Sequence, residues 1–187
     1  MEKVKPIETR YKGFRFRSRL EARWAVFFDT LGVKYEYELE GFSLPSGVAY
    51  LPDFFLPDLQ VFVEVKPTEQ IPYVDLKKMI EFALEGDHQL LLIVGSPTQE
   101  QAYVINRRTC SSIEEYEADF EGQATEEQMV EAVFESLRDW SQVQFGVTPL
   151  SRRWDLIYKT LPPYEDHALQ EALLKAKQAR FEHGEQG

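Results

Sequence analysis

The chain is poor in cysteine, in long apolar runs and in positive charge. Its single cysteine is Cys110, which excludes an internal disulfide and a Cys-x-x-Cys metal site. No apolar stretch approaches the ~20 residues that span a bilayer, and the first six residues form no apolar signal segment. These absences predict a soluble cytoplasmic protein that has no membrane partner.

Basic residues are outnumbered, with 21 Lys and Arg against 32 Asp and Glu and a net charge of -11. Such a chain is not expected to coat nucleic acid non-specifically, because it repels phosphate. The excess of acidic side chains is unevenly distributed, however. Residues 1–66 carry 10 basic and 10 acidic side chains, whereas residues 67–187 carry 11 basic and 22 acidic ones. Eight of the basic side chains lie in the first 23 residues, interleaved with aromatic ones. They predict either a phosphate-contacting edge or a solvated basic strand and helix start. The candidate contacts are Lys12, Arg17, Arg19 and Arg23.

Hydrophobic periodicity predicts a mixed α/β core in residues 1–106. A helix begins at Ser18 and stops at Gly32, because five apolar side chains follow at helical spacing before the glycine. A meander of three strands is expected next, then a helix and two strands, the first of them apolar throughout and so covered on both faces. The expected ranges are 33–39, 49–56 and 61–66 for the meander, 74–84 for the helix, and 90–94 and 102–105 for the last strands.

Residues 107–187 are predicted to form an acidic, mainly helical extension packed on this core. Residues 107–124 are mixed and polar, which predicts irregular structure. Thr125 to Gln128 has the form of a capping box, and the helix that it opens carries an apolar face from Met129 to Trp140. Further helices are expected at 150–161 and at about 165–181. The Met129–Trp140 helix suits either the core or a homodimer.

Two acids and a lysine gather on adjacent strands of the predicted meander. Alternation places Glu64 and Lys66 on one face of the third strand and its valines on the other. A turn with an even number of residues after the second strand brings Asp53 onto the face of Glu64, whereas a three-residue turn does not. Two carboxylates this close repel each other unless a proton or a cation intervenes, and hard oxygen ligands suit Mg²⁺ or Mn²⁺.

This arrangement resembles the PD-(D/E)xK nuclease superfamily: a Pro-Asp pair at Asp53, about ten residues, then Glu64-Val-Lys66. The helix sequence from Arg17 to Ala25 is also similar to small bacterial and phage members. The resemblance implies a restriction-endonuclease-like α-β-β-β-α-β core in an α/β protein of a bacterial or phage-infected cell. It further implies Asp53, Glu64 and the Val65 carbonyl as metal ligands, Lys66 as the group that orients or activates water, and Glu21 as a further acid. The expected activity is Mg²⁺- or Mn²⁺-dependent cleavage of nucleic acid, with DNA as the expected substrate.

Each residue also has a structural alternative. Asp53 could be an ordinary acid next to a turn, and Glu64 and Lys66 could form an exposed ion pair. Ser18-x-x-Glu21 is itself a capping box, in which Glu21 stabilises the start of the helix. Two other functional classes stay open on the sequence. One is an inactive relative that binds nucleic acid or a protein. The other is an acidic polyanion mimic, supported by the excess of acid after Lys66.

Overall fold

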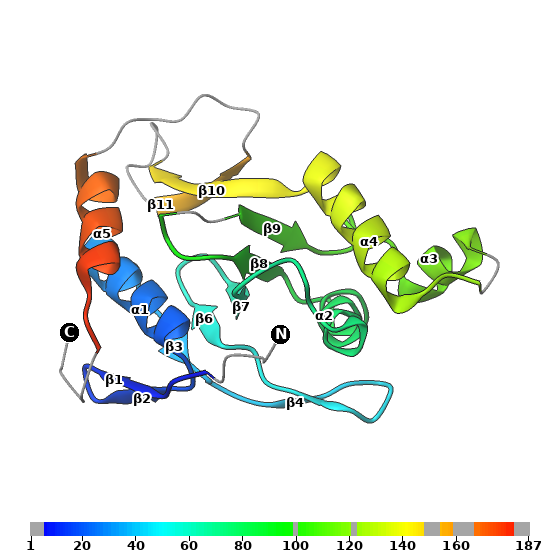
Figure 1. Ribbon diagram of the computed structural model, residues 1–187, viewed down its shortest axis with the longest axis horizontal. Helices are drawn as coiled ribbons and strands as arrows, with labels where there is room; N and C mark the ends of the chain where they lie inside the picture. The colour runs from blue at the N-terminus through cyan, green and yellow to red at the C-terminus, as the bar shows by residue number, and fades with distance from the viewer. Residues whose placement is uncertain (1–5, 99–100, 121–122, 148–153, 159–166, 182–187) are drawn as a thin grey trace.

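The computed structural model describes residues 6–98, 101–120, 123–147, 154–158 and 167–181 (Figure 1). The described residues form a mixed α/β structure, as predicted, with one principal sheet and helices on both of its faces. None of the helices in these ranges is long and apolar enough to cross a membrane.

The principal sheet has the strand order β11-β10-β9-β8-β7-β6-β3. β7 and β8 pair in parallel, and the other neighbours are antiparallel. β7 and β8 therefore need a crossover connection, which α2 provides. The strands are β3 (Glu36–Tyr37), β6 (Phe54–Leu56), β7 (Val61–Lys66), β8 (Leu90–Val94), β9 (Gln101–Ile105), β10 (Gln142–Val147) and β11 (Trp154–Tyr158).

Two hydrophobic clusters cover the two faces of the sheet. The first joins α1 (Arg19–Leu31) and α5 (His167–Gln178) to one face, which includes the three valines of β7. The second joins α2 (Tyr73–Glu85), α3 (Ile113–Asp119) and α4 (Glu126–Trp140) to the other. β8 supplies both clusters in alternation and is buried throughout, as its continuous apolar sequence predicts. Figure 1 shows α1 beside α5, with α3 and α4 at the other end of the view.

The predicted helix ends are confirmed by their hydrogen bonds. Ser18 caps α1 by accepting from the Glu21 N–H at 3.2 Å. Gly32 adopts a left-handed conformation with φ of 69° and donates to the carbonyls of Phe28 and Asp29. Thr125 and Gln128 form the predicted capping box of α4. The α4 side chains Met129, Val133, Phe134 and Leu137 are buried within the chain, and a homodimer through the C-terminal helices stays a prediction.

The meander is present, but its first two strands are shorter than predicted. The range 33–39 reduces to β3, and 49–56 divides at Leu51–Asp53. Ala49–Tyr50 (β5) pairs with Phe42–Ser43 (β4) in a separate two-stranded sheet, and only β6 joins the principal one. Pro52 has no N–H to donate to a ladder, which explains the break. A further small sheet pairs β1 (Thr9–Tyr11) with β2 (Phe14–Phe16).

Two predictions after residue 106 are wrong. The range 107–124 is not wholly irregular, because it contains α3, which opens with a capping box between Ser112 and Glu115. Within 150–161 the described residues form the strand β11 rather than a helix, paired with β10, which was not predicted. In the sequence, Trp154, Leu156 and Tyr158 fit the alternation of a strand as well as the range fits the spacing of a helix. Pairing with the edge of β10 decides between the two patterns. The rest of that range lies outside the described residues.

The sheet continues across the predicted boundary at residue 106, since β10 pairs with β9. The last predicted helix is confirmed as α5, although its expected start at residue 165 lies outside the described residues. Ala172 and Ala176 of α5 are fully buried in the cluster that α1 supplies. The division into a core and an extension stays a prediction.

The packing of α5 against α1 gives a stability test. Ala176→Leu adds a large side chain at a fully buried position, so we expect it to lower the free energy of unfolding by about 1–3 kcal/mol. Gln170→Leu, at an exposed position of the same helix, is expected to change it by less than about 0.5 kcal/mol. Urea unfolding monitored by circular dichroism measures both. Equal stability of the two variants would contradict the packing.

Candidate active site

The register of β6 against β7 brings the predicted acids together. Phe54 pairs with Val63 and Leu56 with Val61, which leaves a turn of four residues, 57–60. Four is one of the even lengths that the sequence requires for a shared face. The same register, continued by one residue, sets Asp53 opposite Glu64 at the end of the strand pair.

Asp53 is held against the main chain of β7. Its Oδ2 accepts a hydrogen bond of 2.8 Å from the Val65 N–H, and the side chain is buried. Along β7 the main chain of Phe62 and Lys66 bonds toward β8. Because the polar groups of successive strand residues face opposite edges, those of Val65 face the side where β6 has ended. The Val65 carbonyl therefore lies at the edge that Asp53 occupies.

Glu64 is buried and has a different partner on each oxygen. Its Oε1 accepts from Lys66 Nζ at 2.6 Å, and its Oε2 accepts from the Tyr50 hydroxyl at 2.8 Å. The Lys66 side chain is 24% exposed, so it is partly accessible to solvent while its ammonium group bonds Glu64. Tyr50 belongs to β5, and the sequence prediction gave it no role. Its position three residues before Asp53 is the only sign of it in the sequence.

The electrostatics of the site reflect two acids in a buried place. Burial first, and then the charges of Glu64 and Glu21, raise the pKa of Asp53 well above its ordinary value. Burial acts to lower the pKa of Lys66, but the Glu64 and Asp53 carboxylates outweigh it and leave that pKa raised. Burial also raises the pKa of Tyr50 well above its usual range, so its hydroxyl remains a donor. The site therefore holds an ammonium group beside acids that repel each other.

Glu21 caps α1 and also faces the site. Its Oε1 accepts from Ser18 Oγ at 2.6 Å, while its Oε2 accepts from the Arg17 N–H at 3.1 Å and from the Tyr37 hydroxyl at 2.7 Å. Its charge contributes to the raised pKa of Asp53. Glu21 therefore has the structural role of a helix cap. Its charge also acts on Asp53, as a catalytic role would require.

The donor set fits a hard divalent cation in its chemistry. Asp53 and Glu64 offer carboxylate oxygens and Val65 a carbonyl, the ligands that Mg²⁺ takes while keeping several waters. Across the part of the chain that is described, no three His, Cys, Asp or Glu side chains are grouped as a metal site. Glu21 is accordingly not assigned as a ligand. A cation here would be held by two side chains and one main-chain oxygen.

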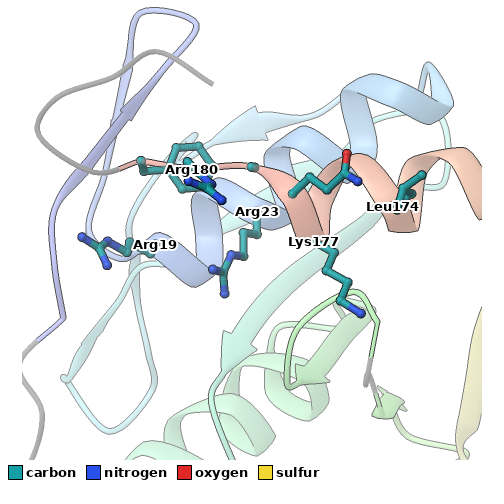
Figure 2. A pocket seen from close by; sticks show the side chains of 8 residues that line it. Arg19, Arg23, Leu174, Lys177 and Arg180 are labelled. Atoms are coloured by element: carbon teal, nitrogen blue, oxygen red, sulfur yellow. The ribbon is translucent and has the colours of Figure 1, made fainter.

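The four predicted phosphate contacts divide into two pairs. Arg17 forms an ion pair with Glu38, and Lys12 forms one with Asp29 at 3.1 Å. Arg19 and Arg23 instead line a groove between α1 and α5, with Lys177 from α5 and Arg180 from the segment after it (Figure 2). The prediction missed the last two, because some 155 residues of chain separate them from the arginines.

Neither a family model, nor a curated protein, nor a solved structure matches this chain. Membership of the PD-(D/E)xK superfamily stays a prediction. It rests on the residues and geometry above.

The repulsion between the acids predicts how Asp53→Asn behaves without a divalent cation. The pKa of Asp53 is higher in the folded chain than in the unfolded chain, where it is ~3.9. The ionised carboxylate therefore costs stability once the pH exceeds that unfolded-state pKa. Asparagine removes that charge and can still accept from the Val65 N–H. In EDTA at neutral pH we expect the melting temperature of the variant to be a few degrees higher than that of the native chain. Each kcal/mol of added stability raises the melting temperature by roughly 2–4 °C.

Added Mn²⁺ should reverse the order. A cation that binds only the folded state raises the melting temperature of the native chain, and the variant should gain much less. Asp58→Asn is the matched control, because Asp58 is exposed in the turn of the same strand pair; it should respond to Mn²⁺ as the native chain does. Equal gains in all three proteins would place the cation elsewhere.

Proposed function

We propose that this protein is a metal-dependent nuclease that hydrolyses phosphodiester bonds of nucleic acid, with DNA as the expected substrate. The observation that carries the proposal is the joint placement of Asp53, Glu64 and Lys66. Asp53 bonds the main chain of β7 at Val65, and Lys66 bonds Glu64 on the same strand. A pair of buried acids beside a half-buried lysine is costly to fold, and such departures from ordinary packing are expected at functional sites.

The order of elements supports the same proposal. α1, β3, β6, β7, α2 and β8 follow one another in the order α-β-β-β-α-β, with the β4–β5 hairpin inserted after β3. This is the order that the resemblance to the PD-(D/E)xK superfamily implies. The acids and the lysine fall on β7 and at the start of β6, where that resemblance expects them.

Each residue has a distinct task in the proposed reaction. Asp53, Glu64 and the Val65 carbonyl would hold Mg²⁺ or Mn²⁺, and that cation would supply positive charge to a bound phosphate. Lys66 has a partly exposed side chain, and its ammonium group can donate to the attacking water or to a phosphate oxygen as negative charge develops. Tyr50 fixes the orientation of Glu64 by its hydrogen bond.

A cleavage assay tests the proposal. Supercoiled plasmid and single-stranded DNA are incubated with the native chain in Mg²⁺, in Mn²⁺ and in EDTA. We expect cleavage only with a divalent cation, and a loss on the order of 100-fold or more for Asp53→Ala and for Lys66→Ala, because each removes a group that acts on charge in the transition state.

Matched controls are Asp58→Ala and Lys34→Ala. These two residues form an exposed ion pair at 3.6 Å on the same part of the sheet, so the variants should cleave like the native chain. Cleavage that persists unchanged in the Asp53 and Lys66 variants would refute the site. Circular dichroism verifies that each variant is folded.

Glu21→Gln separates capping from catalysis. The amide keeps one acceptor oxygen for the hydrogen bonds at the start of α1 but loses the charge that reaches Asp53. If Glu21 acts on the site, cleavage falls roughly tenfold or more while the melting temperature changes little. A lowered melting temperature with full cleavage would assign Glu21 to the helix cap alone.

A further inference from the structure

The groove between α1 and α5 gathers four cationic side chains. It has a volume of about 950 Å³ and is lined by Arg19 and Arg23 from α1, and by Leu174, Lys177, Arg180 and Phe181 from α5 and the segment after it. Figure 2 shows the Arg23 and Lys177 side chains directed to the same side of the helix pair, from different helices. Four cationic side chains thus converge in a chain whose net charge is -11.

Within the described ranges, these four cations lack the counter-ions that their neighbours have. Lys12, Arg17 and Lys175 pair with Asp29, Glu38 and Glu171. No carboxylate among the described residues pairs with Arg19, Arg23, Lys177 or Arg180. The Nε atoms of Arg19 and Arg23 are moreover buried without an acceptor, an arrangement that costs about 1–3 kcal/mol for each such group.

The groove adjoins the candidate active site. Arg19 and Arg23 lie four residues apart and therefore on one face of α1, whose first turn also holds Glu21. A smaller hollow of about 160 Å³ joins Arg23 and Lys177 to the segment 96–98 after β8. That segment follows Gly95, whose N–H donates to the Lys66 carbonyl at 2.8 Å and whose carbonyl accepts from Trp24 Nε1 at 3.0 Å. The cationic surface therefore begins at the end of the strand that carries Lys66.

The groove is rigid enough to serve as a binding surface. Ala172 and Ala176 are fully buried where α5 meets α1. Phe181 is buried beyond the helix and meets the Tyr11 ring edge-on, with ring centroids 6.4 Å apart. Lys177 and Arg180 are exposed on this anchored support, so their charges are presented without a cost in packing.

We propose that the α1–α5 groove binds the phosphate backbone of a nucleic-acid strand next to the phosphate that is cleaved. The inference rests on the proposed nuclease function and adds the C-terminal helix to the substrate surface. Guanidinium groups without acceptors match phosphate oxygens in charge and geometry. An elongated cationic track suits a chain of phosphates, whereas the described lining offers no exposed aromatic ring on which bases could stack.

A binding titration tests this surface separately from cleavage. Fluorescence anisotropy of a short labelled single strand, and of the corresponding duplex, is followed in EDTA, so that no strand is cut. Lys177→Gln/Arg180→Gln removes two groove charges at exposed positions. We expect on the order of tenfold weaker binding at low salt, and a fall of about 2 in the slope of log K against log salt, about 1 for each lost phosphate contact.

Lys34→Gln/Lys175→Gln is the matched control. It removes the same charge from exposed lysines that already pair with Asp58 and Glu171, and it should keep the native salt slope. If both double variants bind the strand equally weakly, the proposal is overturned, because the loss of affinity would then reflect net charge alone. In a separate titration, inorganic pyrophosphate competes with the labelled strand at equal phosphate concentration. If pyrophosphate displaces the strand, the groove binds a free phosphate, and the proposal is overturned.

The groove and the nuclease proposal can fail independently. Metal-dependent cleavage together with unchanged binding by the groove variant would overturn the groove and leave the active site standing. Selective loss of binding in that variant, with no cleavage by the native chain under any condition, would support the groove and overturn the nuclease function.

Discussion

The register between β6 and β7 is the constraint on which the site depends. A slip of one residue would turn the three valines of β7 away from α1 and move Glu64 and Lys66 into the core beneath that helix. The four-residue turn prevents this slip through local bonds: the Leu59 N–H donates to the Leu56 carbonyl, and the Gln60 side chain donates to the Pro57 carbonyl. Gln60 takes a positive φ of 54° to close the turn, a conformation that costs about 1–2 kcal/mol for a residue with a Cβ.

The acids are tolerated because each has an assigned donor within the protein. Asp53 receives the Val65 N–H, and Glu64 receives Lys66 and Tyr50. These bonds offset only part of the desolvation, since the pKa of Asp53 stays well above its ordinary value. β7 bears this cost because it lies between two neighbours in the sheet and is covered on both faces. A rigid central strand is a suitable support for groups that must keep a fixed geometry.

Local patterns in the sequence predicted most of the elements around the site. Ser18, Gly32 and the Thr125–Gln128 box mark helix ends through hydrogen bonds between near neighbours in the chain, so their outcome does not depend on the rest of the fold. The same kind of signal was present at Ser112 and Glu115 and was overlooked, because the helix that it opens is short.

The errors arise where distant segments decide the structure. Residues 154–158 become a strand because β10 offers an edge to pair with, and no local signal encodes that edge. Tyr50 reaches Glu64 only after the β4–β5 hairpin folds back. The α1–α5 groove joins residues far apart in the chain. Contacts of this kind follow from packing, which periodicity alone does not specify.

The spatial distribution of charge changes what the acidic composition means. By sequence, α5 and the segment after it belong to the acidic part of the chain, yet they contribute Lys177 and Arg180 to the groove. Much of the acid lies instead on α3 and α4, on the other face of the sheet from α1 and α5. Exposed charges separated by more than a Debye length of ~8 Å are largely screened at physiological salt. The potential at the groove therefore depends more on its own four cations than on the net charge, whereas the acidic face that carries α3 and α4 disfavours phosphate. Under the proposed function, this distribution of charge would direct an approaching nucleic-acid strand to the α1–α5 groove.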